Sequence, residues 1–137
     1  MARPVVVMPD AVAVVTGYLR GALAAAGEPV PVVSRVPNPR PPRFLRVRRV
    51  GGIRQTVVSD RPRIDFHAWA ETEAAAADLA ELARALVAVI PGVRDGVTVY
   101  TAREVGGPQW LPDDVTGSPR YAFAAEIHMR GNTFNPS

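Results

Sequence analysis

Residues 43–50 read Arg-Phe-Leu-Arg-Val-Arg-Arg-Val, with arginines alternating with apolar residues. A repeat of two residues is typical of a β-strand with one solvated and one buried face. A second apolar stretch, residues 53–58, follows the pair Gly51-Gly52, and glycines adopt the positive backbone angles of a tight turn without strain. The sequence therefore predicts a β-hairpin over residues 43–58, with the two glycines at its turn.

Three further segments carry the same alternation. Residues 61–70 place Ile64 and Phe66 on one face and Asp65, His67 and Trp69 on the other, so the second face is a potential interface. Residues 97–105 and 120–130 also alternate, and we expect two strands joined by a long loop over residues 106–119. Prolines at positions 29 and 31 restrict residues 30–36 to an edge strand or an ordered loop.

Two helices are predicted from their caps and apolar spacing. Asp10 suits the N-cap of a helix over residues 10–26, and Thr72 suits that of a second helix ending before Pro91. The second helix carries an apolar stripe formed by Ala75, Leu79, Leu82, Leu86 and Ile90. We therefore predict an α+β fold in the order α-β-β-β-α-β-β, with two main helices packed on an antiparallel sheet of four to five strands.

Length and composition limit the protein class. A chain of 137 residues is sufficient for one domain, which we place at residues 1–131, and residues 132–137 lack any pattern and are expected to be a disordered tail. The chain has no cysteine, which excludes disulfides and thiolate chemistry. No apolar run approaches the roughly 20 residues of a membrane span, so we expect no membrane partner and synthesis in the cytoplasm.

Charge is strongly polarised along the chain. Nine of the sixteen basic residues lie between Arg35 and Arg63, together with one acid, Asp60, so this segment carries +8 although the net charge is only +3. All basic residues are arginine, which indicates a GC-rich genome. A basic surface on a small domain suits nucleic acid, an acidic partner, or the acidic side of another copy.

The residues do not form a pattern typical of an active site. His67 and His128 have no second ligand at metal-binding spacing, and Asp113-Asp114 has the form of a solvated turn. The glycine pairs lack the lysine of a phosphate-binding loop, and no serine lies in a nucleophile elbow. We therefore expect no catalytic residue, no metal and no cofactor, and the chain is not predicted to be an enzyme.

Two features favour assembly. Trp110 and Leu111 lie between Pro108 and Pro112, as a rigid apolar knob that anchors in a neighbour's pocket or folds back over its own core. The basic segment also suits head-to-tail contacts with acidic positions elsewhere, and contacts of that heterologous kind close into rings. These acidic positions are Glu71, Glu73, Asp78, Asp113 and Asp114.

Four segments in order carry a resemblance: residues 37–44 (PNPRPPRF), 60–70 (DRPRIDFHAWA), 79–86 (LAELARAL) and 117–123 (GSPRYAF), the last leading into a strand that ends at Arg130-Gly131. In this arrangement the chain resembles the tail terminator proteins of long-tailed, siphovirus-type phages of actinobacteria. The resemblance implies a homohexameric ring at the head-proximal end of the tail tube, which ends tube polymerisation and joins the tail to the head.

The resemblance also implies partners and a location. The partners are other copies of the chain, the major tail tube protein and a head completion or connector protein, with DNA only as cargo in the lumen. The location is the virion, after assembly in the host cytoplasm. Two alternatives stay open: another ring protein of the phage neck, such as a head completion or stopper protein, and more distantly a basic nucleic-acid-binding module.

Charge and expected exposure identify the candidate interface residues. We predict that the following side chains contact neighbouring subunits or the tube: Arg43, Arg46, Arg48, Arg49, Arg54, Trp69, Trp110 and Leu111. Because strong phosphate binding along a conduit slows DNA exit, we expect the arginines to meet acidic protein surfaces and not DNA.

Overall fold

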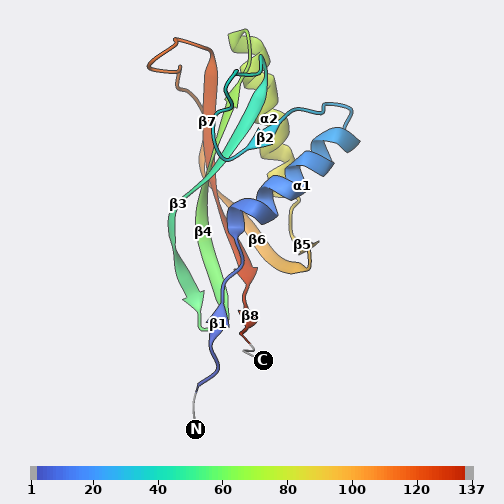
Figure 1. The fold of residues 1–137 in the computed structure, drawn as a ribbon, viewed down its shortest axis with the longest axis vertical. Helices are drawn as coiled ribbons and strands as arrows, with labels where there is room; N and C mark the ends of the chain where they lie inside the picture. Colours follow the sequence, from blue (N-terminus) through green and yellow to red (C-terminus); the bar gives the residue numbers. More distant parts are fainter. Residues whose placement is uncertain (1–2, 135–137) are drawn as a thin grey trace.

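A computed structural model describes residues 3–134 of the chain. In chain order its elements are β1 (Val6–Val7), α1 (Ala11–Ala25), β2 (Val32–Val33), β3 (Phe44–Thr56), β4 (Ser59–Trp69), α2 (Glu73–Ala88), β5 (Gly92–Arg94), β6 (Val97–Trp110), β7 (Arg120–Arg130) and β8 (Asn132–Thr133). Six strands form one sheet in the order β2-β3-β4-β7-β6-β5, and β1 pairs with β8 in a second, two-stranded sheet (Figure 1).

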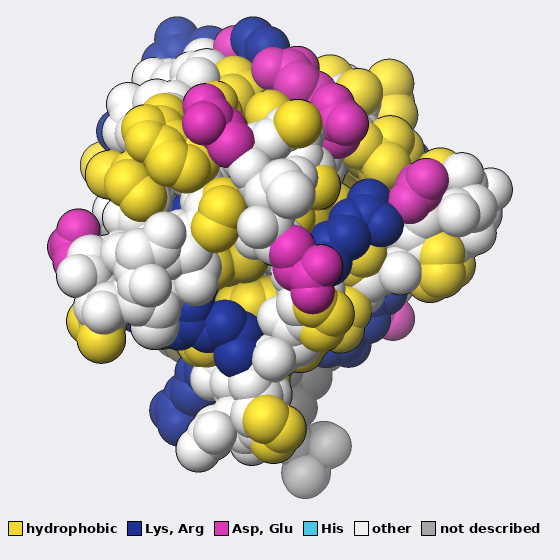
Figure 2. Space-filling view, turned by 90° about the horizontal axis from the view of Figure 1, so that it is seen from above, with side chains coloured by type: hydrophobic (Ala, Val, Ile, Leu, Met, Phe, Trp, Pro, Cys, Tyr) yellow, Lys and Arg dark blue, Asp and Glu magenta, His cyan; other side chains and the backbone are white. Residues whose placement is uncertain are grey.

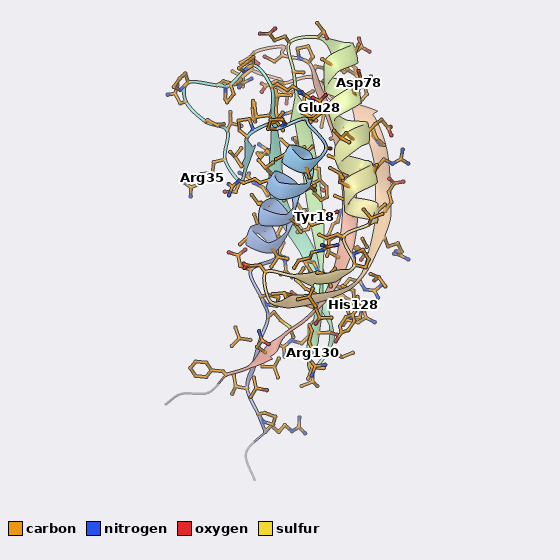
Figure 3. All side chains as sticks on the ribbon, turned by 90° about the vertical axis from the view of Figure 1, so that its right-hand side faces the viewer. Tyr18, Glu28, Arg35, Asp78, His128 and Arg130 are labelled. Carbon is orange, nitrogen blue, oxygen red and sulfur yellow. The ribbon has the colours of Figure 1, made fainter. Side chains whose placement is uncertain are left out.

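The predicted α+β class with two helices is confirmed, but the sheet differs from the prediction. It has six strands, and it is mixed because β2 runs parallel to β3. Both helices lie on the same face of the sheet (Figure 3). The lower ends of β3 and β4 extend beyond the helices, toward β1 and β8 (Figure 1).

The predicted helix caps are confirmed. The side chain of Asp10 accepts a hydrogen bond of 3.1 Å from the backbone N–H of Ala13, and the Thr72 hydroxyl accepts one of 3.1 Å from Ala75. These bonds satisfy backbone donors that the first helical turn leaves unpaired. The buried face of α2 is rotated from the predicted stripe, since it consists of Ala76, Leu79, Ala80, Ala83 and Val87.

The core lies between the helices and the alternate residues of the central strands. On β4, Ile64 and Phe66 are fully buried, and on β7, Phe123 and Ile127 are buried with them. Phe66 stacks on Phe123 with ring centroids 4.5 Å apart. The predicted strands over residues 61–70 and 120–130 are therefore confirmed, together with the face that each buries.

The prediction of a turn at Gly51-Gly52 is wrong. Strand β3 continues through both glycines, and the turn is formed by Val57 and Val58. The glycines form a β-bulge, because the register with β4 shifts between Arg49 and Gly52. Gly52 faces Pro62, which has no N–H to donate, and both glycines have positive φ angles, 103° at Gly51 and 95° at Gly52.

The predicted loop over residues 106–119 is too long. Strand β6 continues to Trp110, and only residues 111–119 connect it to β7. Two register shifts, on either side of Gly106, keep the strand paired with β7. The glycines of this segment therefore produce bulges and not a loop.

The tail predicted to be disordered is ordered in its first part. Val6 pairs with Thr133 and Val7 with Asn132, and Phe134 donates a 2.7 Å hydrogen bond to the Val5 carbonyl. This approach favours Gly131, since a Cβ there would lie 2.8 Å from Cγ1 of Val6 and 3.0 Å from the backbone oxygen of Val7. The remainder of the predicted tail, residues 135–137, lies outside the described residues.

Candidate assembly interface

The face of the six-stranded sheet opposite the helices, here called the open face, is basic. The register places on it Arg46 and Arg48 of β3, Arg61, Arg63, Asp65, His67 and Trp69 of β4, Arg103 of β6, and Arg120, Glu126, His128 and Arg130 of β7. Among these residues seven are arginines and two, Asp65 and Glu126, are carboxylates. The predicted display of arginines on a sheet face is confirmed for Arg46 and Arg48.

Trp69 is surrounded by three arginine side chains at one end of the open face. Its ring stacks on Phe44 with centroids 4.7 Å apart, and the guanidinium carbons of Arg46, Arg120 and Arg40 lie 5.3, 5.1 and 5.9 Å from its centroid. Such positions are attractive because the ring face is electron-rich. Trp69 is only 2% exposed, so the exposure expected for this residue is not found, and in the monomer it supports the arginines.

Asp113 connects this cluster to the loop of residues 111–119. One carboxylate oxygen accepts backbone hydrogen bonds from Val115 at 2.9 Å and Thr116 at 3.2 Å, and the other accepts one of 3.3 Å from Trp69 Nε1 and contacts Arg40 at 3.3 Å. These backbone hydrogen bonds, helped by Trp69 and Arg40, lower the pKa of Asp113 to about 2 against the opposing effect of burial. The carboxylate thus holds the loop of residues 111–119 to the proline-rich segment 37–42, which contains Arg40.

The two histidines add no charge to the open face at neutral pH. Arg46 donates a 2.9 Å hydrogen bond to Nδ1 of His67, and because a guanidinium only donates, that nitrogen is unprotonated. Burial, with the charges of Arg46, Arg120 and Arg48, lowers the pKa of His67 to about 4. His128 contacts the Ser59 hydroxyl at 2.9 Å, and burial together with Arg61 lowers its pKa.

Three of the predicted arginines are bound within the monomer away from the open face. Arg43 pairs with Glu28 at 2.9 Å, and Arg49 pairs at 2.9 Å with Asp60, whose side chain is only 5% exposed. Arg54 donates a 3.4 Å hydrogen bond to the carbonyl of Val6, next to β1. By contrast, Arg48 extends into solvent and its contact is a 3.3 Å hydrogen bond to the Ser34 carbonyl.

Trp110 and Leu111 lie at the same end of the molecule as Trp69. Trp110 ends β6 opposite Tyr121, and their ring centroids are 5.4 Å apart. Trp110 nevertheless remains 43% exposed and Leu111 36% exposed. The structure therefore combines the two interpretations of this knob, since Trp110 rests on its own sheet and still presents an apolar surface.

The outer side of α2, here called the acidic face, bears the opposite charge. It carries Glu73 in the first turn of the helix, then Asp78 and Glu81, whereas Glu71 precedes the helix and lines a hollow with Arg40 and Trp69. Its arginine, Arg84, is bound to Glu81 and to Glu104 of β6, so it adds no uncompensated positive charge. Figure 2 looks down on the end of the molecule where α2 begins, and shows acidic and basic side chains with hydrophobic ones between them.

Sequence reasoning missed five arginines that share the open face with Arg46 and Arg48. They are Arg61, Arg63, Arg103, Arg120 and Arg130. Each occupies an alternate position of its strand, so the period-two pattern placed them on one side of that strand. Only the order of the strands in the folded sheet, β3-β4-β7-β6, places the arginines of these four strands on one face.

Within residues 3–134 no group of three or more His, Cys, Asp or Glu side chains is arranged to hold a metal ion. Neither described helix is both long and apolar enough to cross a lipid bilayer. A family model described as phage tail termination protein matches residues 7–136. No sequence among the curated proteins matches the chain.

Proposed function

Because the chain belongs to the phage tail termination protein family, we propose that its copies form a closed hexameric ring on the head-proximal end of the tail tube. The ring stops the addition of further tube subunits at that end of the tube. Its other side is offered to a head completion protein. DNA passes through the lumen as cargo. The family match over residues 7–136 is the observation that carries this proposal.

The charge distribution supports assembly by head-to-tail contacts. The basic open face and the acidic face of α2 lie on opposite sides of the sheet. A surface of one sign that meets a different surface of the opposite sign makes a heterologous contact, and a rotation between subunits closes such contacts into a ring.

The sheet edges give further support. Strand β2 covers β3 only at Leu45 and Arg46, and β5 covers β6 only along residues 97–99. In the described chain, the outer edges of residues 47–56 and 100–110 therefore have no strand partner. Exposed edges of this kind are templates for pairing with another chain.

The proposed role is structural, and we place the protein in the virion after assembly in the host cytoplasm. A long-tailed, siphovirus-type phage of an actinobacterium remains the proposed origin, on the resemblance and the arginine-rich composition. A head completion or stopper ring is the near alternative, and copurification with heads instead of tails would favour it. The seven arginines of the open face support the more distant alternative of a nucleic-acid-binding module.

The test is termination of tube growth. The major tail tube protein of the same phage is polymerised with and without this chain, and tube lengths are measured by electron microscopy. We expect tubes to stop growing and to carry a ring at one end. Tubes that grow to the same length and bind no ring would contradict the proposal.

A further inference from the structure

We infer that the arginine cluster at one end of the open face docks on the acidic face of α2 in a second copy of the chain. The arginine cluster is defined here as Arg40, Arg46, Arg48 and Arg120. The inference rests on the proposed ring and names the two surfaces that meet in it.

The cluster carries more positive charge than its own chain neutralises. Of its four guanidiniums, only that of Arg40 forms an ion pair in the described chain, with Asp113. Arg46 binds neutral His67, and Arg48 and Arg120 bind backbone carbonyls. Three of the four guanidiniums therefore form no ion pair among the described residues, although Asp65 lies opposite Arg48 on β4, and their positive charge favours an acidic partner.

The acidic face has matching unused charge. Among residues 3–134, Glu71 and Asp78 form no ion pair and no side-chain hydrogen bond, and both are exposed. Asp78 of α2 thus offers the acidic chemistry that the cluster requires, on the opposite side of the sheet, whereas Glu71 lines a hollow together with Arg40 and Trp69 and lies beside the cluster.

The two surfaces also lie at a similar height along the molecule, within about 5 Å by the rise per residue of strand and helix. Trp69 ends β4 and α2 begins at Glu73, so the cluster and the start of the helix share one end. Arg48 pairs with Asp65, about 13 Å along the strand from Trp69, and Asp78 lies about 8 Å along the helix from Glu73. Figure 3 places Asp78 at this upper end of α2. Similar height is what a ring requires when the long axis of the molecule runs along the ring axis, because a closed ring has no shift along that axis.

The geometry favours protein over nucleic acid as the partner. Arg46 and Arg120 are held by His67 and by the carbonyl of Leu111, so their guanidiniums have defined positions that suit fixed carboxylates. Single-stranded nucleic acid binds where bases stack on open aromatic rings, whereas the ring in this cluster, Trp69, is only 2% exposed.

The experiment uses two charge reversals of exposed residues, Arg48→Glu on the cluster and Asp78→Arg on α2. Molar mass is measured by light scattering over a concentration series, alone and with assembling tail tube protein. With either reversal, the side chains at positions 48 and 78 carry the same charge across every contact between copies. We therefore expect about a tenfold or greater increase in the concentration needed for assembly, equivalent to about 1.4 kcal/mol per contact.

An equimolar mixture of the two variants provides the decisive comparison. If copies alternate, each contact again joins opposite charges: the glutamate substituted for Arg48 faces the arginine substituted for Asp78, and native Arg48 faces native Asp78. We therefore expect the mixture to recover assembly, provided that the ring has an even number of subunits. Arg35→Glu is the matched control, since Arg35 is exposed and outside the cluster, and thermal unfolding checks that each variant folds.

Three outcomes would overturn the inference. One is assembly of both reversals at wild-type concentrations, and another is a wild-type protein that stays monomeric alone and with the tube protein. The third is loss of DNA retardation by Arg48→Glu with unchanged assembly, which would assign the cluster to nucleic acid. Rings that form through these surfaces but leave tube length unchanged would contradict the proposed function and keep the inference.

Discussion

His67 and Asp113, at the end of the sheet near the loop of residues 111–119, show how burial and hydrogen bonding determine the protonation of single residues. Arg46, Arg48 and Arg120 crowd around His67, and that ring stays neutral because protonation would add a further positive charge to a half-buried site. Asp113 is the opposite case, since backbone donors stabilise its charged form. His67 and Asp113 both lie beside Trp69, and they therefore titrate in separate pH ranges.

We predict that acid destabilises the fold through His67. The unfolded chain protonates this histidine near pH 6.5 and the folded chain only near pH 4. Between these values the unfolded state binds more protons, so the free energy of unfolding falls as the pH is lowered from 6.5 to 4. His67→Gln, which keeps an acceptor for Arg46, is expected to reduce this slope in urea unfolding. The comparison is His128→Gln, which removes the contribution of His128, whose pKa is also lowered, and keeps that of His67. An unchanged slope in His67→Gln would contradict the prediction.

We predict that Asp113→Ala lowers the free energy of unfolding by about 1–3 kcal/mol, because it leaves the donor of buried Trp69 without its acceptor. Val115 and Thr116 lose their acceptor as well. Neighbouring Asp114 is exposed, so Asp114→Ala serves as the control and is expected to change stability by less than about 0.5 kcal/mol. Equal midpoints of the two variants in chemical denaturation would show that Asp113 does not hold the loop.

At the scale of elements, the bulges in β3 and β6 are the main departures from the predicted pattern. Both contain paired glycines, Gly51-Gly52 and Gly106-Gly107, and both lie within strands that continue past them. The pair Gly51-Gly52 suits a hairpin turn and a bulge equally well, since both accommodate its positive φ angles. The partner strand decides between them, and here Pro62 faces the bulge of β3.

We predict that Gly52→Ala destabilises the hairpin more than Gly51→Ala does. Both positions have positive φ, which costs about 1–3 kcal/mol for a residue with a side chain. At Gly52 the new Cβ would also lie 2.7 Å from the Cα of Pro62, whereas at Gly51 it would meet open space. Thermal unfolding of the two variants checks this order, and equal losses would mean that the bulge yields to the added methyl group.

At the scale of the whole molecule, an exposed apolar site lies at the same end as the arginines around Trp69. Trp110 and Leu111 stay partly exposed at the loop end, and partly exposed aromatic residues are frequent anchors of protein interfaces. A contact of this type depends on burial and not on charge. Its response to salt therefore differs from that of the arginine cluster.

We predict that the double variant Trp110→Ala and Leu111→Ala weakens assembly or tube binding at both low and high salt. Assembly of the wild-type chain through the proposed charged contacts is expected to weaken as salt is raised. Val115→Ala is the matched control, because Val115 is an apolar residue of the same loop and is 93% exposed. Light scattering and tube cosedimentation give the readout. Wild-type behaviour of the double variant would remove Trp110 and Leu111 from the interface.

The sequence by itself determined the elements whose causes are local. Side-chain caps at Asp10 and Thr72 begin both helices, and period-two alternation defines the strands around Phe66 and Phe123 with their buried faces. The sequence also established that arginines alternate with core residues over residues 43–50. Each of these features depends on neighbours within a few positions of the chain, so the pattern alone is sufficient.

Only the tertiary structure decided the features that depend on distant partners. These are the bulge opposite Pro62, the parallel pairing of β2, and the pairing of β1 with β8 beside Gly131. The same holds for the arginines: Arg49 turns to buried Asp60, whereas Arg46 and Arg120, far apart in the chain, share one face around Trp69. The physical reason is that strand order and register, which bring distant residues together, are set by long-range packing and hydrogen bonding and leave no periodic trace in the sequence.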